Sequence, residues 1–249
     1  MQLTFFGTGG SYPTAERQTM CVALPAHRVV LDAGTGLYRA AALGPGPMTA
    51  ILSHSHLDHI AGLTQLHDLF EQGIEPPLEL WADSAVIETI RERLFHPAVF
   101  PCPPAISYRA LPPIGTPFSV RGLKIVRFPL DHPGGASGFR VSDGTWSMAY
   151  CCDTTAITAE LPPDMTGADL LIHDCYLPGE TRDEARRHGH SSAADVAAVA
   201  SAAKAAAVAI VHASPRIADV QALADEVAAG FSGNVFAPQD GDPFEIGGG

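Results

Sequence analysis

Lysine is scarce in this 249-residue sequence: only Lys124 and Lys204 occur, and the longest basic run is RRH at 186–188. Together 15 lysines and arginines face 27 aspartates and glutamates, for a formal net charge of −12. Proteins that grip a long polyanion usually present a basic stripe, so we expect no long nucleic acid as a partner. A small phosphorylated molecule is compatible with this charge, because bound divalent metals reverse the local sign.

Long apolar runs are also missing. The longest, 205–211, is far shorter than the roughly 18 residues that a membrane-spanning helix needs. The N-terminus, MQLTFFGTGG, lacks the basic start and apolar stretch of a secretory signal. The 5 cysteines show no C-x-x-C spacing, which favours reduced structural thiols over disulfides or a cysteine metal site. The sequence therefore predicts a cytoplasmic protein with no membrane partner.

No internal repeat or linker-like change in composition divides the chain, so we expect a single domain over residues 1–249. Apolar runs of strand length alternate with helix-like segments, which is typical of the α/β class. The proline-rich segment 97–117 is predicted to be a loop with room for one short strand. We expect strands near 2–7, 27–32, 49–53, 78–82, 118–129, 137–142, 145–152, 168–173, 206–212 and 234–237, and helices near 35–43, 58–72, 84–95, 191–204 and 217–229.

The stretch SHSHLDH, residues 53–59, follows an apolar strand and carries the main functional signal. Residues two apart in an extended segment point the same way, so His54, His56 and Asp58 project from one side of the strand end. His59 follows as the chain turns into a helix. Imidazoles and a carboxylate at this spacing suit zinc or a similar divalent ion. There are too many ligands for one site, which indicates two metals.

This pattern, H-x-H-x-D-H, resembles the signature of the metallo-β-lactamase superfamily. The resemblance implies further ligands at later strand ends, and they occur in order: His132 in FPLDHPGG, Asp153 in SMAYCCDTT and His212 in AVAIVHASPR. It also implies a four-layered αββα sandwich with the metals at one edge between the sheets. The implied ligand sets are His54, His56 and His132 for one metal, and Asp58, His59 and His212 for the other, with Asp153 bridging them.

Two supporting motifs are similar to those of the family. In LDAGTG, residues 31–36, the resemblance implies that Asp32 orients a metal ligand from behind. GTGGS, residues 7–11, resembles the glycine-rich turn after the first strand. We expect its glycines to permit positive φ rather than to bind phosphate.

The C-terminal third resembles the ribonuclease Z-like phosphodiesterase branch, through LLIHDCYL (170–177), RHGHSS (187–192) and HASPR (212–216). In that branch a carboxylate after the LLIH strand pairs with a histidine at a helix start, which here implies Asp174 and His190. With the ligand Asp58, these form the expected catalytic set. Arg216 is either a contact to a substrate phosphate or an exposed arginine.

The chain departs from ribonuclease Z, because only 20 residues separate His132 from Asp153. That interval has no room for the long transfer-RNA arm, which makes tRNA processing an unfavourable interpretation. The compact layout is similar to that of the phosphoribosyl cyclic phosphate phosphodiesterases of phosphonate degradation. Their cysteine-rich structural zinc site has no counterpart here, so the substrate does not carry over.

The resemblance therefore implies a hydrolase with two divalent ions, zinc first and manganese or iron(II) as alternatives. We expect a metal-bound hydroxide to attack a small cyclic or nucleotide-like phosphodiester, with His190 as general acid. A carbonyl hydrolase (lactonase, thioesterase or β-lactamase-like) and a non-catalytic carrier or binding protein are the alternatives. Homodimers are common among such relatives, and the sequence is compatible with one.

Overall fold

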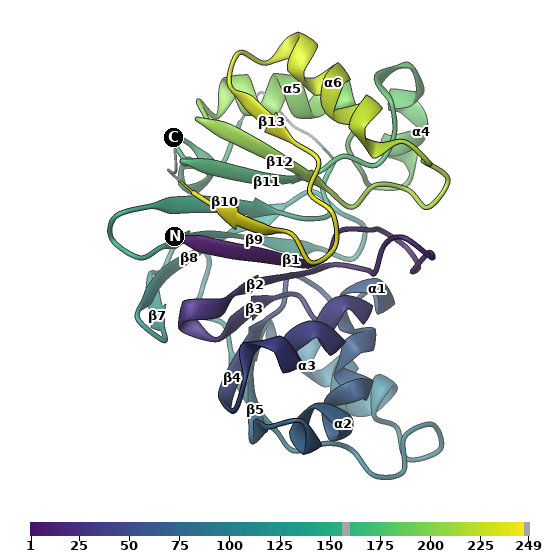
Figure 1. Cartoon of the computed structure of the whole chain (residues 1–249), viewed down its shortest axis with the longest axis vertical. Coiled ribbons are helices and arrows are strands. Elements are labelled where there is room, and N and C mark those ends of the chain that lie inside the picture. Colours follow the sequence, from purple (N-terminus) through teal and green to yellow (C-terminus); the bar gives the residue numbers. More distant parts are fainter. Residues whose placement is uncertain (156–159, 247–249) are drawn as a thin grey trace.

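The computed structural model describes residues 1–155 and 160–246, which form two seven-stranded sheets packed face to face. Figure 1 shows helices α1–α3 outside one sheet and α4–α6 outside the other. The expected four-layered αββα sandwich is confirmed. Among the described residues no helix has the length and apolar character needed to cross a membrane.

The first sheet contains the N-terminal strands and one strand from the C-terminal end. It is antiparallel from β14 to β3 and parallel from β3 to β6. Its order is β14 (Pro243–Glu245), β1 (Gln2–Gly7), β2 (Cys21–Leu24), β3 (Val29–Leu31), β4 (Gly46–Ile51), β5 (Ile74–Ala82) and β6 (Ile106–Ala110). Its helices are α1 (Leu57–Ile60), α2 (Leu66–Glu71) and α3 (Ser84–Thr89), with 3-10 helices Thr35–Leu43 and Ala61–Gln65.

The second sheet is antiparallel from β7 to β10 and parallel from β10 to β13. Its order is β13 (Asn234–Phe236), β12 (Ala207–Val211), β11 (Leu170–Asp174), β10 (Ser147–Cys151), β9 (Ala136–Ser142), β8 (Leu123–Leu130) and β7 (Phe118–Val120). Its helices are α4 (Arg182–Arg187), α5 (Ala193–Ala202) and α6 (Val220–Gly230).

Strand alternation divides the apolar residues between three cores. In β3, Val29 and Leu31 enter the core between the two sheets, while Val30 faces the helices. In β12, Val211 faces the same central core and Ile210 packs towards α5 and α6. Because side chains alternate with period two, a strand buried on both faces reads as a continuous apolar run. This explains why so many runs in the sequence lack polar residues.

Parallel pairing places several strand ends at one edge of the sandwich. The carboxyl ends of β3 and β4 are neighbours in the first sheet, and those of β10, β11 and β12 are neighbours in the second. The polar residues that follow these strands therefore converge, as ligands do outside the carboxyl ends of parallel strands in open sheets.

Several predicted elements were wrong in detail. The strand expected over 118–129 is two strands, β7 and β8, joined by a turn in which Arg121 and Gly122 have positive φ. The helix expected over 58–72 is broken into α1, a 3-10 helix and α2, and that expected over 35–43 is a 3-10 helix. The strands β2 and β14 and the short helix α4 were not predicted. The proline-rich segment does contain one short strand, β6.

Candidate metal centre

The first group of predicted ligands, His54, His56, His132 and Asp153, lies together at the carboxyl edge of the strands. One candidate ligand atom from each lies within 4.8 Å of the others. His132 Nε2 is 3.1 Å from His56 Nδ1 and 3.6 Å from Asp153 Oδ2, and His54 Nε2 is 3.5 Å from the same oxygen. The structure thus brings together the set implied for one metal.

The second group contains Asp58, His59, His212 and the same Asp153, again with ligand atoms within 4.8 Å of one another. Asp153 Oδ1 is 3.2 Å from both His59 Nε2 and His212 Nε2. Asp58 Oδ2 is 3.1 Å from His212 Nε2 and 3.7 Å from His59 Nε2. The two carboxylate oxygens of Asp153 therefore face different groups, which is the placement that a bridging ligand requires.

These atoms fit divalent ions by spacing and by protonation. Nitrogen and oxygen ligands about 2.0–2.2 Å from a tetrahedral ion lie about 3.3–3.6 Å from one another, close to the 3.1–3.7 Å seen here. His54 Nε2 and Asp153 Oδ1 are buried without a hydrogen-bond partner among the described residues. Buried polar atoms rarely stay unpaired; an ion in the first group would satisfy His54 Nε2, and an ion in the second would satisfy Asp153 Oδ1.

Outer hydrogen bonds set the ring orientations. The Nδ1 atoms of His54, His59 and His132 lie 2.9 Å from Ser53 Oγ, Asp32 Oδ2 and the Gly189 carbonyl oxygen. A proton donated outward from Nδ1 leaves the Nε2 lone pair for a metal. The resemblance implied this role for Asp32 alone, and the other two acceptors carry no signal in the sequence.

Asp32 is the centre of a fully buried network behind the site. Besides contacting His59, it accepts hydrogen bonds from the backbone and hydroxyl of Ser53 and, at 2.8 Å, from the Tyr150 hydroxyl. Its φ of 58° is left-handed, a conformation that aspartate and asparagine tolerate better than most residues. The network fixes the carboxylate, and the carboxylate fixes His59.

The electrostatics of the cluster put His54 and Asp153 in their metal-binding protonation states but not His59. Burial and the neighbouring His59 lower the pKa of His54 to about 2, so its ring is neutral at pH 7. Burial alone would raise the pKa of Asp153, but His212 and His59 outweigh it and hold that pKa well below its usual range. Neutral imidazoles and an ionised carboxylate are the forms in which these side chains bind metals. Burial alone would lower the pKa of His59, but Asp153 and other acidic neighbours outweigh it and hold that pKa well above its usual value, so this ring releases a proton when a metal binds.

The predicted pair, Asp174 and His190, lies beside the second group. Asp174 is the last residue of β11, and its Oδ2 is 2.9 Å from His190 Nδ1. Candidate ligand atoms of Asp174, His190 and His212 lie within 4.8 Å of one another. Burial raises the pKa of Asp174 and lowers that of His190. Both shifts favour the uncharged form of the side chain concerned.

Tyr176 is a site residue that sequence reasoning missed. Its ring stacks on His190, with centroids 4.3 Å apart, and its hydroxyl is 3.0 Å from Ser11 Oγ. The backbone N–H of Ser11 in turn donates to Asp58 at 2.7 Å. Tyr176 follows Asp174 by two positions, so the two-residue period of an extended segment was the signal that could have found it.

A model of the family described as "Beta-lactamase superfamily domain" matches residues 27–213. The chain belongs to the beta-lactamase superfamily. Ribonuclease Z of Natronomonas pharaonis is 27% identical over 308 aligned positions, which cover 99% of this chain and 98% of that protein. Since this chain has 249 residues, at least 59 of those positions have no counterpart in it.

Solved structures of the superfamily fold agree. The metallo-beta-lactamase fold protein YhfI from Bacillus subtilis superposes with a TM-score of 0.82 at 22% identity, over 98% of each chain. A diphosphatase from the PhnP family superposes with a TM-score of 0.72 at 18% identity, over 98% of this chain and 96% of that one. At these identities the likeness establishes the fold, and the resemblance inferred from the motifs is confirmed at that level.

The glycine-rich turn of this superfamily member corrects one expectation. Gly7, Gly9 and Gly10 do not have positive φ; the left-handed residue of the turn is Ser11, with φ 63°. A Cβ at Gly10 would lie 2.6 Å from the His212 ring, and one at Gly7 would overlap the backbone of Thr19. These two glycines are required by close packing against a metal ligand and a neighbouring strand.

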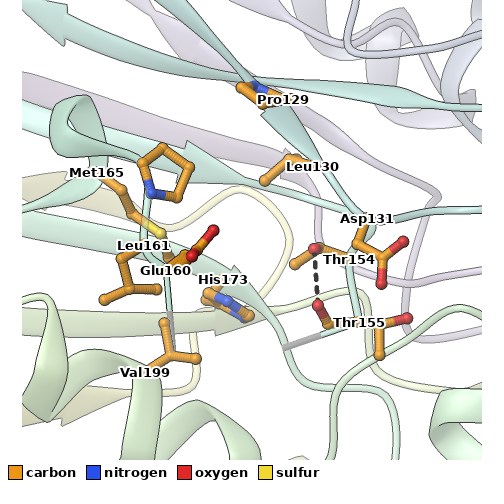
Figure 2. A pocket seen from close by; sticks show the side chains of 11 residues that line it. Pro129, Leu130, Asp131, Thr154, Thr155, Glu160, Leu161, Met165, His173 and Val199 are labelled. Carbon is orange, nitrogen blue, oxygen red and sulfur yellow. Dashed lines mark hydrogen bonds between the residues drawn. The ribbon is translucent and has the colours of Figure 1, made fainter. Parts of the chain in front are cut away.

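A cavity of about 370 Å³ is lined by Asp131 and Thr154, the chain neighbours of His132 and Asp153. Figure 2 shows apolar side chains and Glu160 to one side of His173, and Asp131 with Thr154 to the other. His173 donates from Nδ1 to the Asp174 carbonyl oxygen at 2.8 Å, and burial lowers its pKa to about 4. His173 is thus a buried histidine that is neutral at pH 7.

Proposed function

We propose that this protein is a metal-dependent phosphodiesterase that hydrolyses a small cyclic or nucleotide-like phosphodiester. The observation that carries the proposal is the Asp174–His190 pair at 2.9 Å, next to two ligand groups that share Asp153. An alkoxide is a poor leaving group, so breaking a phosphodiester demands a proton donor in addition to the metals. Zinc is the preferred ion, with manganese and iron(II) as alternatives for the same donors.

The proposed roles of the residues follow from their positions. Divalent ions held by the two groups would lower the pKa of water towards about 7 and stabilise charge on the phosphoryl oxygens. Asp153 would link the two ligand groups, and Asp58 would belong to the second group, so that both ions would be held next to the reacting phosphorus. Because its Nδ1 is directed at Asp174, His190 has Nε2 free to face the substrate. A bound phosphodiester anion favours the imidazolium form of His190, in which Nδ1–H donates to Asp174 and the Nε2 proton passes to the leaving oxygen.

The chain favours a small substrate over transfer RNA. The interval between His132 and Asp153 is occupied mainly by the hairpin of β9 and β10, where the resemblance places the transfer-RNA arm of ribonuclease Z. The 59 or more unmatched positions of the archaeal ribonuclease Z fit the same difference in length. We therefore propose that the activity does not extend to long nucleic acids.

A substrate comparison tests the proposal. Zinc- or manganese-loaded protein would be assayed on bis(p-nitrophenyl) phosphate, an aryl lactone, a thioester and a precursor tRNA, with His190→Ala and His190→Gln beside the wild type. A cyclic nucleotide such as 2′,3′-cyclic AMP, whose leaving group is an alkoxide, would be assayed in parallel. We expect the variants to lose about 10²–10⁴-fold of the activity on the cyclic nucleotide and much less of that on bis(p-nitrophenyl) phosphate, because nitrophenolate leaves without a proton. The tRNA should not be cleaved. Lactone or thioester hydrolysis without diesterase activity, unchanged by the substitution, would instead identify a carbonyl hydrolase. Metal binding without hydrolysis of any substrate would favour the carrier alternative.

A further inference from the structure

We propose that a cleft beside the metal centre, lined by Tyr12 and Arg216, is a nucleobase subsite. This inference deepens the phosphodiesterase proposal and rests on it. The cleft encloses about 350 Å³, at the small end of the roughly 300–1,000 Å³ typical of small-ligand sites. That volume suits a single nucleoside better than a polymer.

The cleft adjoins the second ligand group through its lining residues. Gly10 and Ala213 line it, and the Gly10 N–H donates to the Ala213 carbonyl oxygen at 3.1 Å. Ala213 follows His212 in the chain, and the backbone of Gly10 packs against the ring of that histidine. Ser11, which lies between the lining residues Gly10 and Tyr12, donates its backbone N–H to Asp58 at 2.7 Å.

Tyr12 presents an aromatic face on a braced loop. Its side chain is left 59% exposed, although rings of this size are usually covered. Hydrogen bonds of Arg17 brace the loop: its guanidinium donates to the Thr8 hydroxyl at 2.7 Å and to the Pro238 carbonyl oxygen at 3.2 Å. An exposed aromatic ring beside a reaction centre is a surface on which a nucleobase can stack.

Arg216 adds a second planar surface. Its guanidinium donates to Glu184 at 2.7 Å, which directs the group and offsets much of its charge. A guanidinium stacks on flat π-systems as well as binding anions. The exposed carboxylate of Glu16 also lines the cleft, which opposes a second phosphate there and can accept a hydrogen bond from a base amino group. Together these features favour a base over a polyphosphate.

Binding measurements distinguish the contribution of the base to affinity from that of the phosphate. Isothermal titration of zinc-loaded protein would compare AMP with ribose 5-phosphate, which lacks only the base. We expect AMP to bind wild type at least 10-fold more tightly, and Tyr12→Ala to weaken AMP roughly 5- to 150-fold, the range for loss of base–aromatic stacking. Ribose 5-phosphate should change less than twofold. Tyr12→Phe should retain AMP affinity, and Tyr38→Ala, which removes another exposed tyrosine, should change neither ligand.

Equal affinities of the two ligands for wild type, equal losses of both in Tyr12→Ala, or no binding of either would each overturn the subsite. The phosphodiesterase proposal is judged separately by the diester assay. Hydrolysis of bis(p-nitrophenyl) phosphate without a preference for AMP would leave that proposal standing and remove only the base subsite.

Discussion

At the scale of single residues, the proposed function depends on side chains whose orientation is fixed by hydrogen-bond and stacking partners. Asp32 is the clearest case, since three donors, the backbone N–H and hydroxyl of Ser53 and the hydroxyl of Tyr150, fix it and it fixes His59. His190 is held in the same way by Asp174 on one side and the ring of Tyr176 on another. The charge and direction of each group are therefore set by residues that would not touch the substrate.

Asp32→Asn should weaken zinc binding by about 10- to 100-fold, because loss of an outer partner of a metal-binding histidine typically has this effect. Asparagine tolerates the left-handed backbone at this position, so the substitution isolates the loss of the carboxylate. Competition with a chromophoric chelator measures the affinity. Tyr150→Phe removes one of the hydrogen bonds to Asp32 and should have a smaller effect; unchanged affinity in Asp32→Asn would show that His59 is not oriented this way.

His173 should make stability depend on pH. Its folded pKa of about 4 lies below the unfolded value of about 6.5, so the unfolded chain takes up the proton first on acidification. Its contribution is therefore complete above about pH 6.5 and is lost as the pH falls towards 4, by up to about 3 kcal/mol. Urea unfolding of metal-free wild type and His173→Asn between pH 4 and 8 tests this. The same pH dependence of the free energy of unfolding in the two proteins would contradict it.

At the scale of elements, the site depends on strand ends and on loops that pack closely against them. The turn after β1 reaches across to β12, where Gly10 lies against the His212 ring. The segment before α5 carries His190, and that helix is capped by Ser192 and Asp195. A small local change in either place should therefore be detected at the metal centre or in the stability of the fold.

Gly10→Ala should reduce the bound metal from two ions towards one, because the new Cβ would lie 2.6 Å from the His212 ring and displace it. Metal analysis after gel filtration gives the stoichiometry. Gly9→Ala is the matched control, since its closest contacts would be 3.2 Å, to Arg17 and Gln18. Two bound equivalents of metal in Gly10→Ala would show that the turn shifts to accommodate the new Cβ and that His212 keeps its position.

Ser192→Ala should lower the free energy of unfolding by about 1 kcal/mol, the usual effect of losing a helix N-cap. In this capping box the Ser192 hydroxyl accepts from the Asp195 backbone N–H at 3.3 Å, and the buried Asp195 carboxylate accepts from the Ser192 backbone N–H at 3.2 Å. Ser201→Ala, at an exposed position in the same helix, should change stability by only a few tenths of a kcal/mol. Equal effects of the two substitutions in urea unfolding would exclude a capping role.

The proposed ligands could be found in the sequence because each follows a strand that is apolar enough to recognise. His212 after AVAIV and Asp153 after SMAYCC are examples. Strand β14 was missed because it has three residues, one of them proline, and lies at a sheet edge, where periodicity gives little signal. The Gly10–His212 contact joins residues about 200 positions apart, so only the tertiary structure reveals it.

At the scale of the whole molecule, two sheets and their outer helices form a scaffold with one polar edge. The superfamily fold accounts for most of the chain, and the short interval between His132 and Asp153 leaves a hairpin there. Acidic net charge and a compact outline are consistent with a small substrate. The local charge that receives a phosphate would come from the metals, not from the surface as a whole.

A zinc titration of metal-free protein, followed at once by binding and by hydrolysis of bis(p-nitrophenyl) phosphate, tests the two-metal phosphodiesterase most directly. We predict two equivalents bound per chain, with the diesterase rate rising mainly as the second site fills. Saturation at one equivalent, or two bound equivalents with no hydrolysis of the diester, would contradict it.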